Sequence, residues 1–174
     1  MTLISRKVVP SSAILAMSSG LIFGIPSSSA ADDEVPVLGT ANAESDDLGQ
    51  STIEVNEATR STESDFVTIT WTFRNNTGKE YDAKDLGNTL YPYNDYSVSG
   101  VTALDEKAKI RYHPIQDSEE FCLCAGQFYP HDFREKIPNG ASGTYWTSYM
   151  IPSETNEITI EVPGFESLEG VTIE

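Results

Sequence analysis

The sequence predicts an all-β protein, built as an antiparallel sandwich or barrel. Apolar and polar residues alternate with a period of two in several segments, which is typical of half-buried strands. Clusters of turn-forming residues separate these segments. Beyond residue 31, no window keeps helical spacing of its apolar residues over more than a turn or two. Short strands joined by turns are the pattern of antiparallel sandwiches.

The clearest predicted strand covers residues 67–74, where Val67, Ile69, Trp71 and Phe73 alternate with polar residues. β-branched and aromatic side chains at alternate positions suit a pleated surface with one buried face. Shorter strands follow the same rule, and loops rich in Asn, Gly and Pro divide them. These strands contain Ile53/Val55, Ile110/Tyr112, Ile158/Ile160/Val162 and Val171/Ile173, and the turns lie at 75–78, 94–95, 138–140 and 163–164.

Residues 1–31 have the three parts of a secretory signal peptide. Arg6 and Lys7 form a basic start, an apolar run follows, and small residues lead to an exit at Ala30 and Ala31. The alternative is a retained membrane anchor, which needs about 20 predominantly apolar residues. Serine, proline and glycine interrupt the run, so we expect cleavage, a secreted or cell-surface protein, and no membrane span in the mature chain.

The charge balance excludes several classes of partner. The 174 residues include 11 Lys and Arg against 27 Asp and Glu, a formal net charge of -16. The signal contains two basic residues and no acidic one, so its removal changes the net charge from -16 to -18. Such a chain is a poor partner for nucleic acid or an anionic membrane. With 39% hydrophobic residues, it has enough apolar side chains for a core.

The mature chain divides into a tail and one domain. Residues 32–50 are acidic and small, with no Lys, Arg or aromatic residue. Burial of so little apolar surface does not offset the conformational entropy lost when the segment becomes ordered. We therefore expect a disordered acidic linker. Residues 51–174 form the predicted β domain, close to the usual size of one sandwich.

Two stretches of this domain resemble a known class of proteins. VTITWTFRNNTGKEYD (residues 67–82) and IPNGASGTYWTSYMIPSETNEITIEVPGF (residues 137–165) are similar to the opening and closing halves of immunoglobulin-like domains in small exported actinobacterial proteins. The resemblance implies an antiparallel immunoglobulin-like β-sandwich in a cell-surface or extracellular setting. It implies no catalytic residues, and the widely spaced cysteines of antibody domains are missing.

The two cysteines, Cys122 and Cys124, are separated by a single residue. Export favours a disulfide between them, and a turn brings such close cysteines within bonding range. Closure of so short a loop contributes roughly 1.6 kcal/mol, so the expected role is a local clip. A redox-active pair and a thiolate metal site remain alternatives. Neighbouring Glu119 and Glu120 disfavour a reactive thiolate, because they raise thiol pKa values.

Two further metal sites are conceivable. His113 and His131 are the only histidines, but their spacing from the cysteines matches no standard zinc arrangement. Oxygen-bearing side chains after the first long strand suit extracellular Ca²⁺, although the loop is not a helix-loop-helix motif. These side chains are Asp82, Asp85, Asn88, Asn94 and Asp95. We expect solvated loops at both places and therefore no cofactor.

Tyrosines gather in the same loop region, at Tyr81, Tyr91, Tyr93 and Tyr96. Recognition loops use tyrosine because it offers contact area at low entropic cost, although packing over the sandwich edge explains the cluster equally well. No catalytic motif is found. The resulting hypothesis is a secreted, non-enzymatic binding or surface-interaction module, with an extracellular protein or cell-envelope ligand as partner. The competing hypothesis is an extracellular redox or metal-handling protein that uses Cys122 and Cys124.

Overall fold

The computed structural model describes residues 36–91, 93–94, 96–129 and 133–174. All of them belong to one compact unit. The predicted signal peptide, residues 1–31, lies outside the described residues, as do His131 and Asp95.

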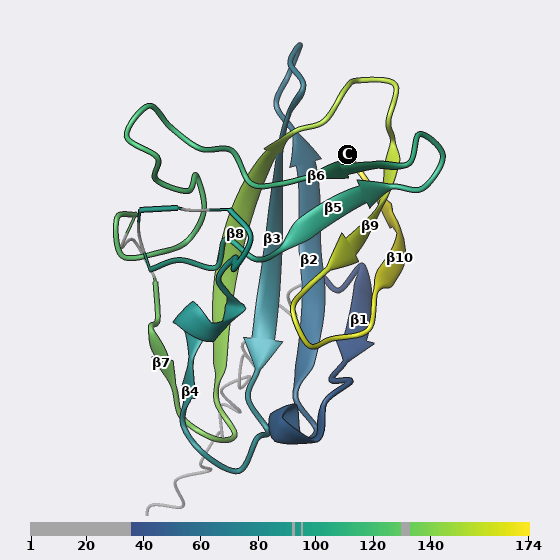
Figure 1. The fold of residues 1–174 in the computed structure, drawn as a ribbon. Coiled ribbons are helices and arrows are strands. Elements are labelled where there is room, and N and C mark those ends of the chain that lie inside the picture. Colours follow the sequence, from purple (N-terminus) through teal and green to yellow (C-terminus); the bar gives the residue numbers. More distant parts are fainter. Residues whose placement is uncertain (1–35, 92, 95, 130–132) are drawn as a thin grey trace, which may run out of the picture. The chain divides into compact units, whose positions relative to one another are not determined.

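The described residues form an all-β protein in which all paired strands are antiparallel (Figure 1). One four-stranded sheet has the order β1 (Gly39–Asn42), β2 (Thr52–Arg60), β3 (Phe66–Arg74), β8 (Ser142–Met150). The other has the order β10 (Leu168–Thr172), β9 (Glu157–Glu161), β5 (Thr102–Asp105), β6 (Ile110–Tyr112). A small third sheet pairs β4 (Tyr81–Asp82) with β7 (Lys136–Ile137). Two 3-10 turns are present, η1 (Asp46–Leu48) and η2 (Ala83–Leu86).

The central strand β3 confirms the period-two prediction. Its alternating residues Val67, Ile69, Trp71 and Phe73 are all fully buried. β3 pairs along its whole length with β8, so that Trp71 lies opposite Tyr145 with ring centroids 5.0 Å apart. Aromatic cross-strand pairs of this kind stabilise a sheet beyond their buried area.

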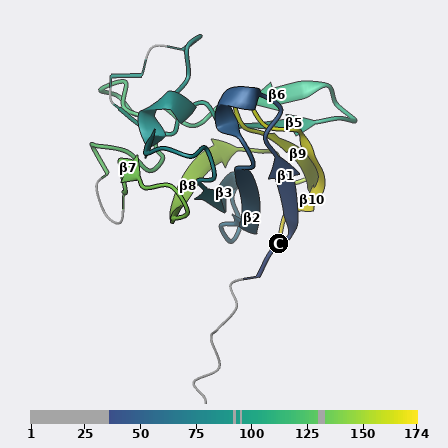
Figure 2. The same cartoon turned by 90° about the horizontal axis from the view of Figure 1, so that it is seen from below.

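The two large sheets face each other across one hydrophobic core (Figures 1 and 2). Ile158 and Ile160 of β9 are buried in that core, as their alternation predicted. Phe73 of the first sheet contacts Phe165 edge-on at 6.0 Å. The buried Tyr149 hydroxyl donates a hydrogen bond to the Val101 carbonyl at 2.9 Å, which ties the first sheet to the chain entering β5. Burial and hydrogen bonding thus act together at the centre of the fold.

A carboxylate stabilises the turn between β5 and β6. Asp105 accepts hydrogen bonds from the backbone N–H of Ala108 (2.8 Å), the Thr155 hydroxyl (2.7 Å) and the backbone N–H of Lys107 (2.9 Å). These bonds hold the pKa of the Asp105 carboxyl below its ordinary value. The folded protein therefore favours the charged form of the Asp105 carboxyl.

The prediction of a disordered linker is wrong for residues 39–50. Strand β1 pairs with the edge of β2 through four residues, from Gly39 opposite Val55 to Asn42 opposite Thr52. Ala41 and Leu48 are buried in the core. Composition was misleading because backbone pairing to an existing edge orders a segment that could not form a core of its own. The domain thus includes most of the segment predicted as a linker.

Candidate functional site

Two long loops form the candidate site. The tyrosine loop, residues 87–101, leads into β5, and the cysteine loop, residues 113–135, connects β6 to β7. The cysteine loop lies along the free edge of β8: the Ala125 N–H donates to the Trp146 carbonyl at 2.8 Å and the Ser148 N–H to the Leu123 carbonyl at 3.1 Å. It thereby covers a sheet edge that would otherwise present unpaired backbone groups.

The tyrosine loop pairs in turn with the outer side of the cysteine loop. The Val98 N–H donates to the Ala125 carbonyl at 3.1 Å, and the Gln127 N–H donates to the Tyr96 carbonyl at 2.8 Å. Gly126 makes this approach possible, because a Cβ atom at this position would lie 2.5 Å from the Ser97 Cβ. The site is therefore built on backbone pairing that continues outward from β8.

The predicted disulfide is present between Cys122 and Cys124, whose Cα atoms are 5.3 Å apart. Both cysteine side chains are fully buried. The turn before them is held by Asp117, whose Oδ1 accepts hydrogen bonds from the N–H groups of Glu119 (2.9 Å) and Phe121 (3.0 Å). The clip and the turn together determine where the Phe121 ring lies.

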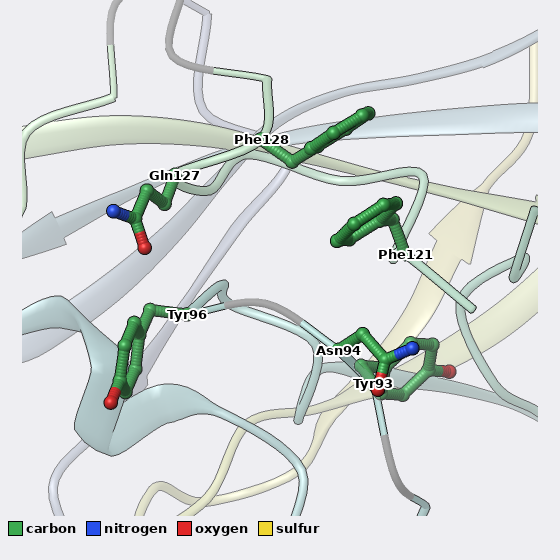
Figure 3. Close-up of a pocket in the computed structure, with 6 residues that line it drawn as sticks. All are labelled: Tyr93, Asn94, Tyr96, Phe121, Gln127 and Phe128. Carbon is green, nitrogen blue, oxygen red and sulfur yellow. The ribbon is translucent and has the colours of Figure 1, made fainter. Parts of the chain in front are cut away.

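The two loops line a pocket of about 550 Å³ that is open to solvent. We call it the aromatic pocket. Residues of the cysteine loop form one side and residues of the tyrosine loop the other (Figure 3). Its lining residues carry aromatic or amide side chains: Tyr93, Asn94, Tyr96, Phe121, Gln127 and Phe128. This volume is typical of small-molecule sites.

Two of the aromatic rings of the pocket, those of Phe121 and Phe128, belong to a larger array of rings in contact. Phe121 and Phe128 stack face to face, with centroids 3.8 Å apart and an interplanar angle of 8°. Phe128 meets Tyr129 edge-on at 5.3 Å, and Tyr129 meets Trp146 of β8 edge-on at 6.0 Å. The array continues from the pocket to a strand of the sheet. Large rings fixed in this way present contact area at little entropic cost.

Exposure marks the pocket as a surface feature. Tyr96 is 65% exposed and Phe128 is 45% exposed. Two large exposed aromatic residues thus line one pocket, and exposed apolar surface of this kind marks interaction sites. The Tyr93 ring is half-buried, and its hydroxyl donates to the Pro114 carbonyl at 2.8 Å.

The four tyrosines predicted for recognition do not share one surface. Tyr93 and Tyr96 line the aromatic pocket. Tyr91 is exposed and contacts the His113 ring, with centroids 4.4 Å apart. Tyr81 is half-buried and packs on Phe73 at 4.8 Å. Its position is that of a packing residue, the alternative explanation for the cluster.

Burial also changes the ionisation of two of these side chains. Desolvation, helped by the charges of Asp85 and Asp82, raises the pKa of Tyr81 to about 12. Desolvation and the positive charge of Arg111 lower the pKa of His113. The buried His113 Nδ1 atom has no hydrogen-bond partner among the residues that the structure describes. The neutral forms of Tyr81 and His113 are therefore favoured in the folded protein.

Sequence reasoning missed three of the lining residues: Phe121, Gln127 and Phe128. All three lie in the cysteine loop, for which the sequence indicated a disulfide, a redox-active pair or a metal site but no aromatic surface. The aromatic residues around the cysteines (Phe121, Phe128 and Tyr129) were the available signal.

Three of the residues suggested for metal binding, Cys122, Cys124 and Asp82, have other partners. Cys122 and Cys124 are joined to each other. Asp82 forms ion pairs with Lys136 and with Lys84, the latter at 2.7 Å. Burial alone would raise the pKa of Asp82, but hydrogen bonds from these two lysines hold it below its ordinary value. Across the part of the chain that the structure describes, no group of three or more His, Cys, Asp or Glu side chains is placed to hold a metal ion.

The chain matches no protein-family model, no curated protein and no solved structure. No helix among the described residues is long and apolar enough to cross a membrane. The class that fold and site define is therefore an all-β protein with an exposed aromatic pocket between two loops.

Proposed function

We propose that the protein is an exported, non-enzymatic binding module that recognises its partner through the aromatic pocket. The observation that carries this proposal is the exposed pair Tyr96 and Phe128 on opposite sides of one pocket. Partially exposed aromatic residues around a hollow are typical of binding surfaces. Its lining residues are Tyr, Phe, Asn and Gln, which include no activated nucleophile and no carboxylate or imidazole for acid–base catalysis.

The strand order supports an immunoglobulin-like architecture for this module. In such sandwiches one sheet has the order A-B-E-D and the other has C′ beside C in the order G-F-C-C′. Strands β2, β3 and β8 match A, B and E, and β10, β9, β5 and β6 match G, F, C and C′. Residues 123–125, which pair with β8, occupy the place of strand D. β1 is then an additional strand beside A.

Export is proposed from residues 1–31 and is consistent with the disulfide, since disulfides persist in oxidising compartments. Mass spectrometry of the protein recovered from the culture medium or cell surface tests this step. The expected mature chain begins at Ala31 or Asp32 and lacks two thiol hydrogens. An intact Met1 or two free thiols would contradict it.

The competing proposal, redox or metal handling through the cysteine pair, has less support. Both side chains are fully buried, so neither sulfur is accessible to a partner thiol without local opening. Titration of thiols in the folded protein with a mild reductant separates the two proposals. A binding module keeps its disulfide under these conditions, whereas a redox protein loses it readily.

Binding to isolated cell envelope from the exporting organism tests the proposed function. The variant Tyr96→Ala/Phe128→Ala removes both exposed rings, and Met150→Ala removes an exposed apolar side chain, 55% exposed, at the end of β8. We expect the pocket variant to bind at least tenfold more weakly than wild type, because exposed aromatic anchors carry much of the energy of such contacts. The Met150→Ala control is expected to bind as wild type. Equal binding by all three proteins would refute the proposal.

A further inference from the structure

The aromatic pocket also indicates the chemistry of its ligand. We infer that it recognises a quaternary ammonium group carried on a small molecule, an inference that rests on the proposed binding function. Three features of the pocket support it: its aromatic rings, the local charge and the engaged donors of the Asn94 amide.

The first feature is the number of rings. Tyr93, Tyr96, Phe121 and Phe128 supply four of the six lining side chains. The face of an aromatic ring carries negative potential, and rings gathered around a hollow attract an organic cation. Because the rings come from both loops, a ligand in the hollow has aromatic groups on more than one side (Figure 3).

The second feature is charge. The lining residues are all neutral, so no cation among them repels a cationic ligand. Glu120 lies at the margin, where its Oε2 atom accepts a hydrogen bond from Asn94 Nδ2 at 3.2 Å. Lys84 lines a neighbouring hollow with Tyr96, but its ammonium is paired with Asp82 at 2.7 Å. The chain as a whole has a net charge of -16, which raises the local concentration of cations and disfavours anions.

The third feature separates a quaternary ammonium from other ligands. The Asn94 amide NH₂ already donates to the Glu119 carbonyl at 3.0 Å and to the Glu120 carboxylate at 3.2 Å, so both of its N–H groups are engaged within the protein. A primary ammonium is strongly hydrated and needs acceptors for three donors. A quaternary ammonium has no donor to satisfy and keeps its charge, so aromatic faces suit it better than they suit a lysine side chain.

Titration with choline chloride, followed by NMR of the Asn94 and Gln127 side-chain amides, tests the inference. The matched control is the neutral carbon isostere of choline, dimethylbutanol, which has the same shape without the charge. Sodium chloride at equal concentration controls for ionic strength. We expect choline to shift the amide signals of the pocket and to bind at least tenfold more tightly than the isostere.

Two variants assign the effect to the rings. Tyr96→Phe keeps the ring and should bind choline within about twofold of wild type. Tyr96→Leu should lose about fivefold, the contribution of one cation–π contact at an exposed site. Tyr96 is 65% exposed in the wild type, so neither substitution is expected to affect folding.

Equal affinity for choline and its isostere would overturn the inference, and so would the absence of any shift with choline. If wild type still exceeds the Tyr96→Ala/Phe128→Ala variant in envelope binding, only the ligand class is wrong and the binding function stands. If that difference is also absent, the proposed function itself is wrong.

Discussion

Removal of the Cys122–Cys124 disulfide should lower the free energy of unfolding by about 1.6–3 kcal/mol. The bridge closes a loop of three residues, for which the chain-entropy account gives a stabilisation of about 1.6 kcal/mol. Both sulfur atoms are fully buried, so their deletion in Cys122→Ala/Cys124→Ala also loses apolar contacts, at about 0.8 kcal/mol for each methylene-sized group. We expect the variant to lose about 3 kcal/mol and the reduced wild type to lose about 1.6 kcal/mol.

Urea unfolding, monitored by the fluorescence of Trp71 and Trp146, measures both losses. Wild type is unfolded with and without a phosphine reductant, and the double variant serves as the reference that reductant does not affect. The urea concentration at the midpoint of unfolding should fall, while the slope of the free energy of unfolding against urea concentration stays constant. An unchanged midpoint in the reduced wild type would refute the loop-closure reasoning. A loss above about 4 kcal/mol would refute it as well, because the bridge would then be a global support.

Three further predictions concern the fold. Leu48→Ala should lower the free energy of unfolding by about 2–4 kcal/mol in a thermal melt, because Leu48 is buried in the core. The control Asp47→Ala, at an exposed position, should change it by less than about 0.5 kcal/mol. Negligible effects of both substitutions would restore the hypothesis of a disordered linker. The lowered pKa of Asp105 contributes stability that is complete above about pH 4 and is lost as pH falls through the folded value. Asp105→Asn should therefore flatten the acid limb of the curve of stability against pH, and an unchanged acid limb would contradict the assigned role of Asp105. Tyr81 ionises more readily in the unfolded chain, near pH 10, than in the folded protein, near pH 12, so stability should fall as pH rises between these values. Tyr81→Phe should reduce that loss, and an identical alkaline limb in wild type and variant would contradict the assigned environment.

The strands could be predicted where burial alone determines the pattern. Val67, Ile69, Trp71 and Phe73 alternate because β3 has one face on the core, and a period of two is visible in any sequence with this property. β1 could not be predicted in this way. β1 is ordered because its backbone pairs with that of β2, and backbone hydrogen bonds do not depend on amino-acid composition.

The site was only half predictable for a related reason. Tyr93 and Tyr96 were visible as aromatic residues in a loop, and both line the aromatic pocket. Phe121 and Phe128 join them only because the cysteine loop pairs with β8 on one side and with the tyrosine loop on the other. Contacts between loops more than twenty residues apart depend on the fold, and local sequence patterns do not encode them.

Photo-crosslinking in the exporting cells determines whether the protein recognises its partner through the aromatic pocket. Benzoylphenylalanine at Phe128 keeps an aromatic ring at the pocket, and the same group at Met150 samples an exposed site of similar accessibility, 55% against 45%. After illumination, mass spectrometry of the recovered protein should show an adduct at position 128 and none at position 150. Adducts at equal yield from both positions, or none from position 128, would contradict recognition through the aromatic pocket.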